Sequence, residues 1–147
     1  MITRRYFAGL LITAAFPVHA LARERIQATL YKNPLCGCCE GHARYLRRNG
    51  FDVKEVPTHD LSLIRRERGV PEKLEGCHTI LIDKYVVEGH VPIGPIRRLL
   101  TERPDITGIS LPGMPTGSPG MNGPKLEPFI IYEIANTEGE PKVFAQE

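Results

Sequence analysis

The spacing of apolar and polar residues predicts a succession of short strands and helices from about residue 26 onward. Apolar and β-branched residues alternating with polar ones indicate half-buried strands, and apolar residues three or four apart indicate helices with one buried face. The predicted elements are strands at 26–31 and 51–56, helices at 40–48, 60–68 and 92–102, and a hairpin of strands at 79–82 and 85–88. Asn49-Gly50, Gly69 and Pro71 supply helix stop signals between them.

This order, β-α-β-α-β-β-α, matches an α/β thioredoxin-like sandwich. Residues 104–125 are rich in proline and glycine and are predicted to form a loop. Two further apolar runs, 129–135 and 142–145, predict a C-terminal β-hairpin extension.

The first 22 residues have the composition of a cleavable export signal rather than of the fold. Arg4 and Arg5 precede an uncharged apolar stretch that is too short to span a membrane, and Ala20-Leu21-Ala22 fits a cleavage site. The arginine pair fits either a twin-arginine signal or an ordinary secretory signal. We therefore expect a periplasmic protein whose functional domain spans residues 23–147.

The net charge of the predicted domain differs from that of the whole chain. The chain has 19 Lys and Arg against 17 Asp and Glu, and two of the arginines lie in the predicted signal. The remaining domain is formally neutral, which gives no support for nucleic-acid binding. No later stretch is long and apolar enough for a membrane helix, so no membrane association is expected after signal removal.

Three of the four cysteines lie within four positions, in Cys36-Gly37-Cys38-Cys39, between a predicted strand and a predicted helix. Backbone N–H groups at a helix N-terminus favour the thiolate, which serves both metal ligation and disulfide exchange. Two structural disulfides are an alternative, but bridges within one turn close very short loops and contribute little entropy.

The predicted topology brings distant residues to this turn. Cys77 and His78 precede one hairpin strand and His90 follows the other, so all three should approach Cys36–Cys39. His42 either shares the helical face of Cys38 and Cys39 or is a solvated helix residue. In the predicted loop, Met114 and Met121 either cover the site with soft sulfur or merely anchor the loop to the surface.

Several chemistries fit these residues. Thiolates from Cys36, Cys38, Cys39 and Cys77 suit Cu(I), with His78 and His90 as further ligands. Cys36 and Cys39 also have the spacing of a thiol-disulfide or copper oxidoreductase, with Cys36 as nucleophile and Cys39 as resolving thiol, although Cys38 would interfere with simple exchange. Three thiolates and a histidine would also satisfy zinc. An Fe–S cluster fits less well, because adjacent cysteines do not match ferredoxin spacings.

Four ordered motifs carry a family resemblance. They are Leu35-Cys36-Gly37-Cys38-Cys39, Gly76-Cys77-His78-Thr79, Glu88-Gly89-His90-Val91-Pro92, and the run from Pro112 to Met121. Together they resemble the bacterial CopG-type copper-resistance proteins over about residues 26–147. The resemblance implies an exported thioredoxin-like protein that works with other copper-handling proteins. It also implies copper binding by the four cysteines as a multinuclear thiolate cluster. Cys77-His78-Thr79 stands where ordinary thioredoxins carry a cis-proline loop, which argues against general dithiol-reductase activity.

Overall fold

The computed structural model describes residues 24–135 and 139–147, so the predicted signal at 1–22 lies outside the described residues. Its elements are β1 Ile26–Lys32, α1 Gly37–Arg48, β2 Phe51–Pro57, α2 Leu61–Glu67, the 3-10 helix η1 Glu72–Leu74, β3 Thr79–Ile82, β4 Tyr85–Glu88, α3 Ile93–Glu102, β5 Gly108–Ser110, β6 Ile130–Ile134 and β7 Val143–Gln146. None of the described helices is long and apolar enough to cross a membrane.

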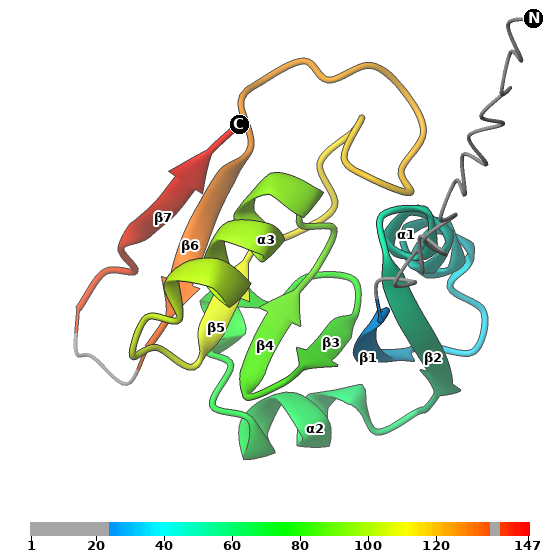
Figure 1. Cartoon of the computed structure of the whole chain (residues 1–147), viewed down its shortest axis with the longest axis horizontal. Helices are drawn as coiled ribbons and strands as arrows, with labels where there is room; N and C mark the ends of the chain where they lie inside the picture. Colours follow the sequence, from blue (N-terminus) through cyan, green and yellow to red (C-terminus); the bar gives the residue numbers. More distant parts are fainter. Residues whose placement is uncertain (1–23, 136–138) are drawn as a thin grey trace, which may run out of the picture.

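All seven strands form one mixed sheet in the order β2-β1-β3-β4-β5-β6-β7. Strand β1 is parallel to β2 and antiparallel to β3, β3 is antiparallel to β4, and β4 is parallel to β5. Strands β6 and β7 continue the sheet in antiparallel fashion. Figure 1 shows β2 and β7 at the two ends of the sheet, with α3 lying across β4 and β5. The protein is thus a mixed α/β protein.

The predicted order of strands and helices is confirmed through α3, and the predicted hairpins are β3–β4 and β6–β7. Asp60 occupies the N-cap position of α2 as expected, but its side chain makes no capping hydrogen bond.

The prediction of an unbroken loop over 104–125 is wrong, because Gly108–Ser110 forms β5. This strand is only three residues long, too short for a periodic pattern to register. Glycine is required at 108, where any side chain would collide with the Val86 carbonyl of the neighbouring strand. Strand β5 joins the C-terminal hairpin to the main sheet.

The core lies on both faces of the sheet because successive strand residues point to opposite sides. In β4, Val87 packs in the larger apolar cluster together with buried residues of α1 and α3. Its neighbour Val86 packs in a smaller cluster with Val70 and Leu74, which follow α2. Buried residues of α1 and α3 therefore pack on one face of the sheet, and the segment after α2 packs on the other.

Candidate metal centre

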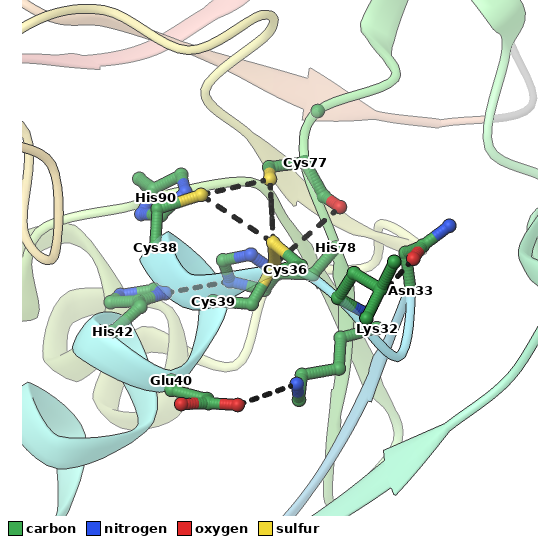
Figure 2. The surroundings of a disulfide bond; sticks show 12 residues. Lys32, Asn33, Cys36, Cys38, Cys39, Glu40, His42, Cys77, His78 and His90 are labelled. Carbon is green, nitrogen blue, oxygen red and sulfur yellow. Dashed lines mark hydrogen bonds and ion pairs between the residues drawn. A yellow bond between two sulfur atoms is a disulfide. The ribbon is translucent and has the colours of Figure 1, made fainter.

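The four cysteines lie together at the start of α1, and we call their sulfur atoms the sulfur group. Cys77 Sγ lies 3.2 Å from Cys36 Sγ, 3.3 Å from Cys38 Sγ and 3.4 Å from Cys39 Sγ. Cys36 and Cys39 are joined by a disulfide, whereas Cys38 and Cys77 are free thiols (Figure 2). The predicted approach of residue 77 to the cysteine turn, across about forty positions of sequence, is confirmed.

Local sequence shapes the cysteine turn. The Asn33 side chain accepts a hydrogen bond from the Leu35 N–H, and its carbonyl accepts one from the Cys36 N–H. Such an Asx turn reverses the chain after β1 and makes Cys36 the N-cap of α1. The helix therefore begins three residues earlier than the predicted 40–48, and Cys38 and Cys39 belong to its first turn.

Cys77 reaches the sulfur group from the segment before β3, and its thiol is partly buried there. Burial raises the pKa of the Cys77 thiol to about 12, and the hydrogen bond with Cys38 adds to this effect. The free thiol is therefore neutral near pH 7, and a bound metal ion would have to displace its proton.

Three histidines form a second cluster beside the sulfur group, and we call it the imidazole group. His42, His78 and His90 are fully buried, and His42 Nδ1 lies 2.7 Å from His78 Nε2 (Figure 2). The ring centroid of His90 lies 5.3 Å from that of His42 and 4.7 Å from that of His78. The interpretation of His42 as a solvated helix residue is wrong: its i+3 and i+4 spacing from the cysteines places it on the buried face of α1.

Backbone carbonyls orient two of these rings. His42 Nε2 donates to the Val91 carbonyl at 3.0 Å, and His90 Nδ1 donates to the Pro119 carbonyl at 2.7 Å. Each ring is thereby left with a lone pair on its other nitrogen. His90 has the usual arrangement of a metal-binding histidine, with one ring nitrogen anchored to a carbonyl and the other free. The second nitrogen of His42 instead faces His78 Nε2 at 2.7 Å.

The imidazole group contains unsatisfied buried nitrogens. Among the residues that the structure describes, His78 Nδ1 and His90 Nε2 have no hydrogen-bond partner. Burial lowers the pKa of His42 to about 3 and holds the pKa values of His78 and His90 below the usual range. All three rings are therefore neutral near pH 7, the form in which imidazole binds metals.

The C-terminal part of the Pro/Gly-rich loop closes over this site. Gly120 packs directly against the first turns of α1, and a Cβ atom on Gly41 would lie 2.8 Å from the Gly120 carbonyl oxygen. The hydrogen bond from His90 to Pro119 fixes the adjoining loop residue. Of the two loop methionines, Met114 is 58% exposed and Met121 is half-buried.

The donor set suits a soft or borderline metal. The ligand atoms of the sulfur group all lie within 4.8 Å of one another, and the same holds for those of the imidazole group. Thiolates select Cu(I) and zinc, and imidazole suits copper and zinc. Once the Cys36–Cys39 disulfide is reduced, the four sulfurs and three imidazoles fit a metal centre. Fold and site together define a mixed α/β protein with a candidate thiolate–imidazole metal centre.

Comparisons with known proteins agree with this class. Two solved structures, "Copper resistance protein copG- Form 2" and "Copper resistance protein copG- Form 1", are 36% and 35% identical to this chain, with TM-scores of 0.77 and 0.76. Both matches cover 84% of this chain, and they cover 99% and 98% of the respective structures. A family model described as "Protein of unknown function, DUF411" matches residues 74–121. No curated protein sequence matches.

The chain therefore belongs to the CopG copper-resistance protein family. The residues matched by the family model include Cys77, His78 and His90 together with the loop that packs on α1.

Proposed function

We propose that this protein binds Cu(I) for copper tolerance, with Cys36, Cys38, Cys39 and Cys77 as thiolate ligands. His78 and His90, together with His42, supply imidazole nitrogens beside them. The observation that carries the proposal is the convergence of four sulfurs from two distant segments at 3.2–3.4 Å. The copper-resistance names of the two similar structures support copper over other soft metals.

The copper-binding form is the fully reduced protein. An external dithiol reductant supplies two electrons and two protons that convert the Cys36–Cys39 disulfide into two thiols, and it is itself oxidised to a disulfide. Binding of Cu(I) then releases thiol protons. Copper affinity should therefore fall as the pH falls. A set of four thiolates can also bridge several ions, so more than one copper per chain is part of the proposal.

Zinc is the alternative metal, because four thiolates or three imidazoles with a water both match its tetrahedral preference. Anaerobic purification followed by elemental analysis, with thiol counting before and after chelation, decides between the two metals. Bound copper, with thiols that react only after chelation, supports the proposal. One zinc ion per chain would instead identify zinc as the bound metal.

Substitution of Cys38 tests the ligand set. Cys38→Ser keeps size and polarity but removes one soft donor, so Cu(I) affinity should fall by about 100-fold or more, beyond the 10–100-fold usual for an outer partner. His59→Asn, at an exposed position, is the matched control and should bind Cu(I) as the wild type does. Wild-type affinity in Cys38→Ser, measured by competition with a chromophoric Cu(I) chelator, would remove Cys38 from the site.

The proposal extends to the cellular context. Residues 1–22 act as an export signal, the domain 23–147 works in the periplasm, and other periplasmic copper-handling proteins supply or accept the ion. N-terminal sequencing of protein from a periplasmic fraction should begin at residue 23. The strand order β2-β1-β3-β4, with β3 antiparallel to both neighbours, supports a thioredoxin-like core.

The Cys36–Cys39 disulfide favours a second candidate, a thiol-disulfide or copper oxidoreductase. One feature weighs against internal exchange: Cys77 Sγ is nearly equidistant from the two bonded sulfurs, at 3.2 and 3.4 Å. In-line attack on a disulfide needs the leaving sulfur to lie a bond length farther away than the attacked one. Turnover in an insulin-reduction assay by metal-free protein would favour the oxidoreductase, and its absence would favour copper binding.

A further inference from the structure

A buried ion pair lies next to the sulfur group but belongs to neither metal-binding cluster. It joins Arg65 of α2 to Glu88 at the end of β4. Arg65 Nε and Nη2 lie 2.9 and 2.7 Å from Glu88 Oε1. Arg65 is 8% exposed and Glu88 is fully buried.

Within the part of the chain that the structure describes, the other side-chain hydrogen bonds of this pair all go to residues 75–79, which we call the Cys77 segment. Glu88 Oε1 accepts from the Gly76 N–H at 2.9 Å, and Oε2 accepts from the Thr79 hydroxyl at 2.6 Å. Arg65 donates to the Gly76 carbonyl at 2.7 Å and to the Glu75 carboxylate at 3.1 Å. Charged side chains thus bind the N–H and the carbonyl of Gly76, immediately before Cys77. They also bind the hydroxyl of Thr79, two residues after Cys77.

The same segment is confined from its other side. A Cβ atom on Gly76 would lie 2.6 Å from the Gly89 Cα, so the two backbones are in direct contact. The Gly89 N–H donates to the His78 carbonyl at 2.8 Å, and the Gly113 N–H donates to the Glu75 carbonyl at 3.2 Å. The backbone around Cys77 is therefore fixed on both sides, and small shifts of Gly76 would carry the Cys77 sulfur with them.

A buried ion pair is weak as a source of stability, because removing two charges from water offsets most of their attraction. The Arg65–Glu88 pair instead orients its neighbours, because a guanidinium and a carboxylate hold their hydrogen-bond partners in fixed geometry. We propose that Arg65 and Glu88 are positioning residues that hold the Cys77 sulfur within reach of the three sulfurs of α1. The relevance of this positioning to copper rests on the proposed function, whereas the position of the Cys77 sulfur can be tested without metal.

The test uses the full-length domain in its reduced, metal-free form. The double variant Arg65→Met/Glu88→Gln removes both charges, yet Gln still offers an acceptor to Gly76 and a donor to Thr79. Diamide takes two electrons and two protons from a pair of thiols to form a disulfide, and peptide mass spectrometry measures how fast Cys77 becomes linked to Cys36, Cys38 or Cys39. We expect this rate to be about tenfold or more lower than in the wild type, because an ångström of displacement strongly reduces effective concentration.

The matched control is Arg98→Met/Glu102→Gln, which removes an exposed ion pair of the same chemistry on α3. Its Cys77 linkage rate should equal that of the wild type. Urea unfolding of all three proteins separates positioning from stability. A wild-type linkage rate in the Arg65/Glu88 variant overturns the proposal. So does a loss of linkage that merely follows a loss of folding.

If the double variant does not fold, Arg65→Lys provides the same test. Lysine keeps the charge paired with Glu88 but lacks the fork that also reaches the Gly76 carbonyl. A reduced linkage rate in the folded Arg65→Lys protein supports the proposal, and an unchanged rate overturns it.

A second measurement connects the pair to copper. In Cu(I)-loaded protein, alkylation of Cys77 should be faster in the Arg65/Glu88 variant than in the wild type, while Cys36, Cys38 and Cys39 stay protected. Equal protection of Cys77 in both proteins would contradict the proposal. A wild-type protein that takes up no copper would refute the proposed function, and the disulfide measurement would still decide the role of Arg65 and Glu88.

Discussion

The sulfur group and the imidazole group are built from neighbouring residues, yet they are different environments. Cys77 and His78 are adjacent in sequence, but the thiol is partly exposed in the sulfur group while the imidazole is fully buried in the other. Adjacent residues in an extended segment point to opposite sides, so one short segment serves both clusters. Helix α1 also contributes to both groups, with Cys38 in the sulfur group and His42, four residues later, in the imidazole group.

The two groups also differ in how they are held. In the sulfur group the sulfur atoms mainly contact other sulfur atoms, so their arrangement depends on redox state and on metal. In the imidazole group the carbonyls of Val91 and Pro119 fix two rings regardless of metal. The comparison indicates a preorganised nitrogen site beside a sulfur site that is completed by reduction.

The largest expected effect separates the adjacent residues Cys77 and His78. Cys77→Ser should lower Cu(I) affinity by about 100-fold or more, whereas His78→Asn, as an outer partner, should lower it by about tenfold. The loss in the free energy of unfolding should be larger for His78→Asn than for Cys77→Ser. His78→Asn breaks a buried contact with His42 and should cost about 1–3 kcal/mol in the free energy of unfolding, whereas Cys77→Ser should cost less.

Chelator competition and urea unfolding measure the two effects. Equal losses of Cu(I) affinity in Cys77→Ser and His78→Asn would mean that the two groups act as a single ligand set.

The next effect concerns pH and the imidazole group alone. The folded protein holds the pKa of His42 at about 3, against 6.5 for an ordinary histidine, and lowers those of His78 and His90. Below about pH 6.5 the unfolded chain therefore binds more protons than the folded one, so metal-free stability is complete above that pH and falls as the pH drops towards 3. The loss should be on the order of a few kcal/mol.

Urea midpoints of the reduced, metal-free protein between pH 7 and pH 4 check this expectation. The decline should be smaller in His42→Asn, which lacks the ring whose pKa is lowered to about 3, and the lowered pKa values of His78 and His90 should account for the decline that remains. A wild-type protein equally stable at pH 7 and pH 4 would show that the imidazoles are not held neutral.

The smallest change in stability is expected for the loop that packs on α1. Gly41→Ala would place a methyl group 2.8 Å from the Gly120 carbonyl oxygen and should cost about 1–3 kcal/mol through overpacking. Gly37→Ala, one turn earlier, meets nothing within 4 Å and should be neutral or stabilising by up to about 1 kcal/mol. Thermal unfolding measures both, and equal stability of the two variants would show that the loop does not pack on α1.

Residue spacing alone was enough to predict the order of most elements and the candidate ligands. Periodic patterns of four or more residues located β1 to β4, all three α-helices and the terminal hairpin, because a buried face leaves a regular signal. The clustering of Cys36, Cys38 and Cys39 identified soft-metal or redox chemistry, and the predicted topology brought Cys77, His78 and His90 towards them.

The other features depend on contacts between segments that are distant in the sequence. Three residues are too few to leave a pattern, so β5 emerged only from its hydrogen bonds to β4 and β6. The burial of His42 and the Arg65–Glu88 pair depend on contacts between segments more than twenty residues apart. Periodicity records which face of an element is apolar, whereas a polar group inside the protein is stabilised by distant partners that only the folded chain brings together.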